Sequence, residues 1–303
     1  MTNKFLKYAK QIAVSTIALA MLSPLISDFV GIIKQKNFIE KKHEITQDCH
    51  ITSLHNHSFY SDGNFHIENM IINCFKEDYS IFAVTDHDND MFYKTVKFFE
   101  GRENDLFNFK IQEINNYTLK ITDIFDIDND NKEDIVYLLK GSEITTEERY
   151  HVLGIAYDDI PKNRQPLEKI IEELVNQDAI IISTHPALLS MYGMGKENVK
   201  KFNEYFDAIE VNGSIPFPLN IYYNRQAVRW GEKYDIPVIA NPDSHIKDVY
   251  FNTFAVLIDK ENFNENKIRE YIKTSLKQGK YKNIEIQPNS IKLYKWEFLN
   301  GRR

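Results

Sequence analysis

Residues 51–87 read ITSLHNHSFYSDGNFHIENMIINCFKEDYSIFAVTDH, and this segment decides the fold that the sequence predicts. Residues 51–54 have the β-branched and apolar character of a strand, and residues 81–85 form a second apolar run. Between the two runs, apolar residues recur at the spacing of one helix face: Ile67, Met70, Ile71, Cys74 and Phe75. The segment therefore predicts a strand, a helix and a second strand in the order of a β-α-β unit.

The same alternation continues along the rest of the chain. Helical spacing recurs near 167–175, 221–234 and 264–277, and short strands are predicted at 179–184, 208–211, 236–240 and 253–258. Strands that alternate with helices indicate parallel β-α-β units, in either a barrel or a doubly wound sheet. Behind an N-terminal segment of residues 1–42, residues 43–303 suffice for one large α/β domain.

An insertion at about 105–140 interrupts this alternation. Residues 117–127 and 134–139 are predicted to form a β-hairpin with an acidic tip. Four carboxylates stand at positions 1, 3, 5 and 9 of a calcium-loop pattern: Asp126, Asp128, Asp130 and Asp134. Tyr137 occupies the position of the usual last glutamate, so the loop is not a full EF-hand. A Ca²⁺ site and a solvated acidic turn both remain open interpretations.

Composition excludes several classes of protein. A hydrophobic content of 43% excludes disorder, and two cysteines cannot build a disulfide framework. Residues 1–42 carry a net charge of +5, whereas the remaining residues carry −12. An acidic body argues against long nucleic acid as a partner, because binding a polyanion requires a basic face. It does not argue against a site for several divalent cations.

Residues 1–42 resemble a targeting or membrane segment. Lys4, Lys7 and Lys10 precede an apolar run that extends, with an interruption at Asp28, to residue 33. The pattern predicts an N-terminal apolar helix that is either a cleavable signal peptide or, if uncleaved, a membrane anchor. Both interpretations make the protein exported or membrane-anchored. A buried core helix is the less favoured alternative, because a basic flank is typical of targeting segments.

Nearly every predicted strand has a histidine or an acidic residue at its end. Because α/β barrels build active sites at the carboxyl ends of their strands, these side chains are expected to share one rim. Imidazole and carboxylate groups without a thiolate suit Zn²⁺, Mn²⁺ or Fe²⁺, and there are too many of them for a single ion. They are His55, His57, Asp86, His87, Glu143, His151, His185, Glu210, Asp243 and His245.

The order of the motifs resembles that of the PHP (polymerase and histidinol phosphatase) family. The match runs from about residue 50 to residue 260, and the HxH, SDG, TDH and DSH elements in this order are specific together. The resemblance implies a distorted seven-stranded (β/α) TIM-like barrel, two or three divalent metal ions and phosphoesterase activity. The motifs are Leu54-His55-Asn-His57-Ser58, Ser61-Asp62-Gly63, Thr85-Asp86-His87-Asp88, Gly141-Ser-Glu143-Ile, His151-Val-Leu-Gly154, Thr184-His185-Pro186, Glu210-Val-Asn212 and Asp243-Ser244-His245.

The resemblance also implies how the ligands divide among three metal positions. The first position would be held by His55, His57, Glu143 and Asp243. Glu143 would bridge to a second position, completed by His151 and His185. Asp62, His87 and His245 would hold the third.

Such a site would hydrolyse a small phosphorylated substrate with metal-activated water. Glu143 would be catalytic as the bridging ligand, and Asp86 is a candidate proton donor to the leaving oxygen. Arg149, Asn212 and Lys247 are candidate substrate contacts because each lies near a motif. The choice among Mn, Zn and Fe, the identity of the phosphoester and the oligomeric state stay open.

Two other functions compete with this interpretation. An amidohydrolase-like metal hydrolase shares the HxH pair and the late aspartate, but commonly uses a carboxylated lysine where this chain has Glu143. A non-catalytic, exported module that binds metal and phosphate is the second alternative. A metal-dependent phosphatase assay separates all three.

Overall fold

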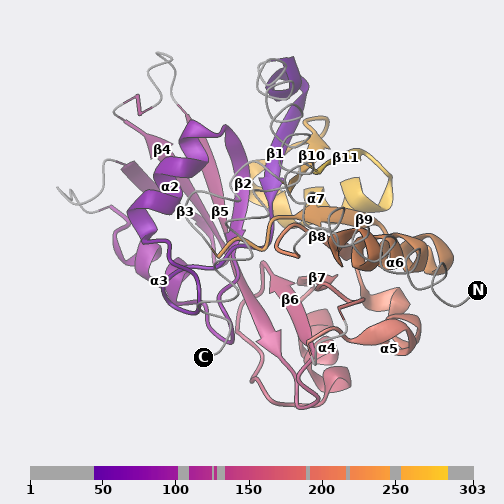
Figure 1. Ribbon diagram of the computed structural model, residues 1–303. Coiled ribbons are helices and arrows are strands. Elements are labelled where there is room, and N and C mark those ends of the chain that lie inside the picture. The colour runs from indigo at the N-terminus through magenta and orange to yellow at the C-terminus, as the bar shows by residue number, and fades with distance from the viewer. Residues whose placement is uncertain are drawn as a thin grey trace, which may run out of the picture.

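A computed structural model describes residues 44–101, 109–124, 126–127, 134–188, 192–215, 219–245 and 254–285 (Figure 1). The predicted apolar helix within residues 1–42 lies outside these ranges, as do Asp128, Asp130 and Lys247. Among the residues described, no helix is both long enough and apolar enough to cross a membrane.

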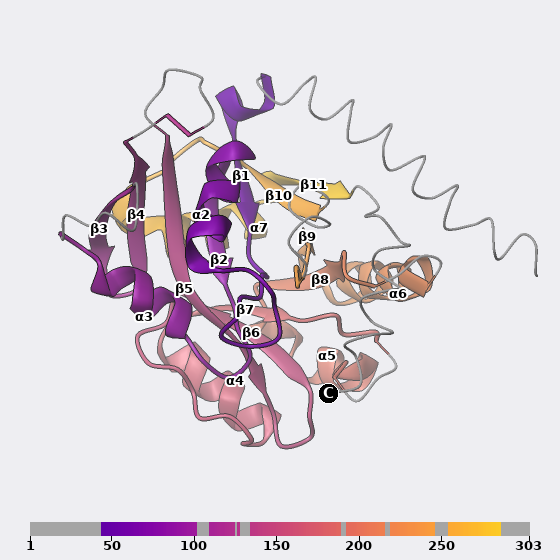
Figure 2. The same cartoon turned by 60° about the vertical axis from the view of Figure 1, so that its left-hand side comes forward.

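The strands join into a single curved sheet that forms a nearly closed barrel, with the helices on its outside (Figures 1 and 2). Nine strands follow one another around the barrel in the order β11-β10-β1-β2-β5-β6-β7-β8-β9. The strands are β1 (Cys49–Ser53), β2 (Tyr79–Val84), β3 (Phe109–Asn115), β4 (Thr118–Asp123), β5 (Ile135–Thr145), β6 (His151–Ile155), β7 (Ile180–Ser183), β8 (Ala208–Asn212), β9 (Val238–Asn241), β10 (Phe254–Asp259) and β11 (Tyr281–Glu285).

The helices whose full extent the structure describes are α2 (Ile67–Lys76), α3 (Met91–Phe98), α4 (Leu167–Asn176), α5 (Gly195–Lys201), α6 (Leu219–Tyr234) and α7 (Ile268–Lys277), with short 3-10 turns η1 (Asn203–Tyr205) and η2 (Glu265–Lys267). Four of these helices lie where the sequence predicted helical spacing, whereas α3 and α5 were not predicted. The predicted apolar face of α2 is buried in full. On α4, Val175 departs from the expected face and is exposed.

Strand direction differs from the expected all-parallel arrangement. β1, β2 and β5 are parallel neighbours, and so are β7, β8 and β9. β6 runs antiparallel to both of its neighbours, and β10 runs antiparallel to β1. Only residues 146–150 connect β5 to β6, whereas a parallel connection requires a crossover of a dozen or more residues. The expected seven-stranded barrel is therefore corrected to a mixed sheet.

The predicted hairpin is present as β4 and β5, which pair from Thr118 with Leu139 to Thr122 with Ile135. The sequence did not reveal β3, which pairs with the other edge of β4. At the tip, the backbone N–H of Ile127 donates to Asp123 Oδ2 (2.6 Å), and Asp126 has a φ of 54°. Because Asp128 and Asp130 lie outside the described residues, the calcium loop stays a prediction.

The barrel closes through side chains between β9 and β11. Asn283 donates from Nδ2 to the carbonyl of Val238 (2.9 Å) and accepts the N–H of Ala240 at Oδ1 (3.0 Å). Tyr281 accepts the N–H of Val238 at its hydroxyl (3.0 Å). At the other end of β9, the N–H of Leu54 donates to Asn241 Oδ1 (3.0 Å). These bonds satisfy backbone groups at the seam that a regular ladder would otherwise pair.

The barrel interior changes character along the strands. Along β5, Tyr137 and Leu139 belong to an apolar cluster that includes Ile81 of β2 and Ile182 of β7. Residues four apart on a strand share a face, so Glu143 points to the same side as Leu139, beyond this apolar layer. The sheet therefore delivers its polar residues to one end of the barrel, at the carboxyl ends of the parallel strands.

Candidate metal centre

All nine residues that the sequence proposed as metal ligands gather at this end of the barrel. The loop after β1 carries three of them, the segment after β9 carries two, and single residues come from the end of β2, from β5, from the start of β6 and from the end of β7. Each has at least one side-chain nitrogen or oxygen within 3.5 Å of another member: His55, His57, Asp62, His87, Glu143, His151, His185, Asp243 and His245.

The first group consists of four atoms that face one point: His55 Nε2, His57 Nε2, Glu143 Oε2 and Asp243 Oδ1. His55 Nε2 lies 3.0 Å from His57 Nε2, 3.4 Å from Glu143 Oε2 and 3.2 Å from Asp243 Oδ1. His57 Nε2 lies 3.2 Å from each of the two carboxylate oxygens. Ligands at the usual Zn–N and Zn–O distances lie about 3.3–3.4 Å apart in a tetrahedron. The group therefore has the spacing of a tetrahedral metal site.

Glu210 orients the ring of His55 from the side that faces away from the first group. His55 Nδ1 lies 2.8 Å from Glu210 Oε1, and both side chains are fully buried. Because an ionised carboxylate can only accept, Nδ1 carries a ring proton, which leaves Nε2 as the nitrogen that could bind an ion beside the other three atoms. Glu210 also accepts from Asn241 Nδ2 (3.1 Å) and from the N–H of His185 (3.0 Å), so its position is fixed as well.

Glu143 connects this group to a second one. Its Oε2 belongs to the first group, whereas its Oε1 lies 2.8 Å from His151 Nδ1 and 3.0 Å from His185 Nε2. The Glu143 side chain is 1% exposed, so both oxygens are desolvated. One carboxylate that turns its two oxygens to two separate ligand sets is the arrangement of a bridged two-metal site.

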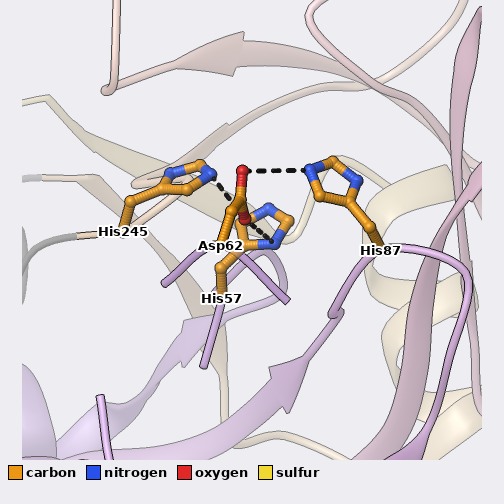
Figure 3. Close-up of side chains that lie close together, drawn as sticks. All are labelled: His57, Asp62, His87 and His245. Carbon is orange, nitrogen blue, oxygen red and sulfur yellow. Dashed lines mark ion pairs between the residues drawn. The ribbon is translucent and has the colours of Figure 1, made fainter. Parts of the chain in front are cut away.

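The third group consists of His57, Asp62, His87 and His245, whose side chains lie close together in Figure 3. Asp62 Oδ1 lies 3.3 Å from His245 Nε2, and Asp62 Oδ2 lies 3.4 Å from His87 Nε2. His57 joins this group through Nδ1, which is 3.5 Å from Asp62 Oδ1, while its Nε2 faces the first group. The side chains of Asp62 and His87 are 49% and 29% exposed, so solvent reaches the centre from here.

The charges of the site are set by mutual attraction. Burial alone would lower the pKa of His57, but the facing carboxylates of Asp243 and Glu143 outweigh burial and raise this pKa to about 10. Burial alone would raise the pKa of Glu143, but the nearby histidines, His151 and His55 foremost, hold it well below its usual range. Desolvated carboxylates of this kind are stable only beside positive charge.

Four buried atoms of the described site are without a hydrogen-bond partner, which fits a site for cations. Within the described structure Asp243 Oδ1, His87 Nδ1, His151 Nδ1 and His185 Nδ1 make no hydrogen bond. His151 Nδ1 is nevertheless 2.8 Å from Glu143 Oε1, so the two atoms are close without being aligned as donor and acceptor. Lone pairs that point to a shared place between the atoms, and not directly at one another, fit divalent ions.

The local backbone is constrained where it carries the site. His185 and Asp243 have positive φ angles of 26° and 49°, a region that non-glycine residues rarely adopt and that is enriched at functional sites. On the loop after β1, a Cβ at Gly63 would lie 2.3 Å from the carbonyl oxygen of His57. Glycine is thus required for the turn that brings Asp62 back toward His57.

Asp86 holds the loop that carries two of the candidate ligands. Its side chain is 1% exposed and accepts from the N–H of Ser58 (2.7 Å), from Ser58 Oγ (2.5 Å) and from Ser61 Oγ (2.6 Å). These three donors belong to the loop after β1, so Asp86 fixes the segment that carries His57 and Asp62. Its role as proton donor to the leaving oxygen stays a prediction.

Asn212 likewise supports a candidate ligand, and its contact with substrate stays a prediction. It is 1% exposed and donates from Nδ2 to Asp243 Oδ2 (2.9 Å) and to Glu210 Oε2 (3.1 Å). Ser214 Oγ donates to Asn212 Oδ1 or to Asp243 Oδ2, each 2.7 Å away. Arg149 lies on the exposed turn between β5 and β6 with a φ of 71°, and its contact with substrate stays a prediction.

With this geometry in view, comparisons with known proteins are informative only at the level of structure. No protein-family profile and no curated protein sequence matches the chain. A two-domain protein from Bacteroides vulgatus that contains a predicted PHP-like metal-dependent phosphoesterase superposes with a TM-score of 0.53 at 16% identity, over 78% of this chain and 65% of that one. The chain has a PHP-like fold. The resemblance that the motifs suggested is thereby confirmed in three dimensions.

Two further solved structures are similar in fold to this chain. PsfC from Pseudomonas syringae superposes with a TM-score of 0.57 at 14% identity, over 83% of this chain and 97% of PsfC. Endonuclease Q, in complex with a 27-mer duplex that has an abasic lesion at the active site, gives 0.50 at 16% identity, over 75% of this chain and 57% of that one. This chain thus spans less than two thirds of endonuclease Q and of the Bacteroides protein.

Proposed function

We propose that this chain is a metal-dependent phosphoesterase that hydrolyses a small phosphate ester with two or three bound divalent ions. The observation that carries the proposal is the position of Glu143, whose two carboxylate oxygens face two separate sets of buried nitrogen and oxygen atoms. The PHP-like fold supports the same reaction class, because a structural neighbour contains a predicted phosphoesterase of this kind.

The described residues would divide the work as follows. When bound, the ions would lower the pKa of a water nucleophile toward ~7 and neutralise the phosphoryl oxygens. Glu210 keeps the His55 lone pair turned inward, and Asn212 with Ser214 holds one oxygen of Asp243 so that the other faces the centre. The half-exposed Asp62 leaves an open side through which a phosphate group would enter.

The amidohydrolase-like alternative has less support in the structure. That chemistry would favour a lysine at the bridging position, but Glu143 occupies it with both oxygens engaged. Lys140 lies three residues earlier on β5 and points to the opposite face, where its Nζ donates to the carbonyl of Asp158 (2.5 Å).

Partner and location form the untested part of the proposal. The acidic body argued against long nucleic acid, yet the structure of endonuclease Q holds a DNA duplex, which weakens that expectation for this fold. Small esters and a short DNA duplex therefore both belong in the substrate panel. Export rests on residues 1–42 alone, which lie outside the described residues.

The test is phosphate release by chelated protein supplied with Mn²⁺, Zn²⁺ or Fe²⁺. We expect turnover of p-nitrophenyl phosphate or of a member of the panel, and its loss together with bound metal in His57→Ala. His66→Ala is the matched control, because His66 is an exposed histidine outside the cluster. Folded protein that releases no phosphate from any panel member with any of these ions would contradict the proposal.

A further inference from the structure

Tyr192 is an exposed aromatic residue placed directly against the candidate centre. Its ring centroid lies 4.6 Å from that of His151, at an interplanar angle of 31°. Tyr192 is nevertheless 44% exposed, so a large part of the ring faces solvent. Exposed aromatic rings are common on protein surfaces, but this one touches a residue whose other side faces Glu143.

The backbone holds Tyr192 firmly in this place. The N–H of His151 donates to the carbonyl of Tyr192 (3.0 Å), which ties the residue to the start of β6. The neighbouring Gly193 packs so closely that a Cβ there would lie 2.3 Å from the carbonyl oxygen of Leu188. An aromatic side chain on a fixed backbone loses little conformational entropy when a ligand stacks on it.

The Tyr192 ring is linked to the third group through the rings of His151 and His87. His87 and His151 have centroids 4.9 Å apart, so His87, His151 and Tyr192 form a row of rings. The row begins next to Asp62, on the solvent-accessible side of the third group. A substrate whose phosphate entered from this side could extend along the row to Tyr192.

We propose that Tyr192, backed by His151, stacks on a planar ring carried by the substrate, and that the site prefers phosphate esters of ring-bearing alcohols such as nucleosides. The inference rests on the proposed phosphoesterase function and names its substrate class. Stacking suits an exposed tyrosine, because every nucleobase offers a flat face regardless of its hydrogen-bonding edge. Tyr192 is thus a specificity residue that acts on the leaving group and not on the phosphate.

The experiment compares two esters that share the same cleaved bond, adenosine 5′-monophosphate and ribose 5-phosphate, with the metal-loaded full chain. Wild type should favour the nucleotide in kcat/KM by roughly five- to a hundredfold, the range for stacking of one base. Tyr192→Ala should bring this ratio close to one through a loss of kcat/KM that is larger on the nucleotide than on ribose 5-phosphate, and Tyr192→Phe should keep the ratio. Tyr205→Ala is the matched control. Tyr205 is 42% exposed and comes just before the start of β8, whereas the candidate metal centre lies at the carboxyl end of that strand.

Two results for the ratio of kcat/KM between the two esters would overturn the inference: a wild-type ratio near one, or a wild-type ratio that is unchanged in Tyr192→Ala. An equal loss of kcat/KM on both esters in Tyr192→Ala would also overturn it, because Tyr192 would then only position His151. If wild type cleaves neither ester with any metal, the phosphoesterase proposal fails for these substrates. Calorimetric binding of the same two ligands then tests the stacking separately. Tighter binding of the nucleotide that Tyr192→Ala abolishes supports it, and equal binding contradicts it.

Discussion

His50 lies near the start of β1 and His57 on the loop beyond its other end, both are buried, and their pKa values shift in opposite directions. Burial, with a smaller contribution from Lys260, lowers the pKa of His50 to about 4. Carboxylates override burial at His57 and raise its pKa to about 10. The ring of His50 packs against Phe263 (4.4 Å between centroids) and Tyr271 (5.9 Å). The same residue type is therefore a neutral core residue at one end of the strand and a candidate ligand beyond the other, and the neighbours decide which.

The largest expected effect comes from removing the carboxylate that both buried groups share. Glu143→Gln keeps the size of the side chain but removes its charge, so we expect loss of metal from both groups and a fall in kcat/KM of about 10³-fold or more. Metal content by plasma mass spectrometry and initial rates measure the two effects. Glu147→Gln, on the exposed turn after β5, is the control. Full metal content in Glu143→Gln would show that the site end of the barrel does not depend on this bridge.

A smaller effect is expected at the open third group. Asp62→Asn weakens the contacts to His87 and His245 but leaves the first and second groups intact. We therefore expect the loss of one ion, retention of the others and a decrease in kcat/KM of about 10²-fold. Titration of chelated protein with Mn²⁺ would distinguish the sites. Loss of every ion from this variant would mean that the three groups form one inseparable unit.

The order of the motifs predicted which candidate ligands lie close together. This was possible because residues at the ends of neighbouring strands meet at one rim of the barrel. That reasoning brought together residues as distant in sequence as His55 and Asp243. It did not reveal that Asp86 holds the loop after β1 and that Asn212 holds Asp243, because a polar residue inside a motif can hold a ligand or hold the loop behind it, and only hydrogen-bond partners separate the two. The row that ends at Tyr192 left no periodic signal in the sequence.

The fold was predicted in the same uneven way. Apolar spacing located α2 and most strands, since burial of one face leaves a pattern that a single sequence can show. The direction of each strand was harder to predict. β6 runs antiparallel because only residues 146–150 connect it to β5, and the residues of β6 itself do not show this. β3 was not predicted, although the alternation of buried and exposed residues at its start, Phe109-Lys110-Ile111-Gln112, is the signal that could have located it.

Residues that only orient a candidate ligand should contribute less to metal affinity than the ligands themselves. Glu210→Gln keeps the shape of the side chain but weakens its acceptance of the His55 Nδ1 proton. Carboxylates that orient a metal-binding histidine are worth about 10–100-fold in metal affinity, so we expect a loss in this range at the first group alone. Competition with a fluorescent chelator measures it. An unchanged affinity would show that the other neighbours orient His55 without Glu210.

The smallest effect is expected at the apolar end of β1. His50 has no hydrogen bond to either ring nitrogen within the described structure, and its pKa of about 4 lies below the ordinary value of 6.5. The unfolded chain binds a proton as pH falls below 6.5, whereas the folded chain binds it only near pH 4, so His50 contributes stability above pH 6.5 that is lost as pH falls through this window. Between pH 7 and pH 5.5 the loss from this residue is about 1 kcal/mol.

His50→Phe keeps a ring in the same aromatic surroundings and removes the titrating group. The free energy of unfolding, measured by urea denaturation of chelated protein, should therefore fall less between pH 7 and pH 5.5 in His50→Phe than in wild type. Chelation keeps the metal centre equal in both proteins, and the exposed His66→Phe should follow wild type. Identical pH profiles for His50→Phe and wild type would mean that His50 gains a partner in solution. His50 and His57 would then differ in how many polar partners each ring has, and not in whether a partner is present.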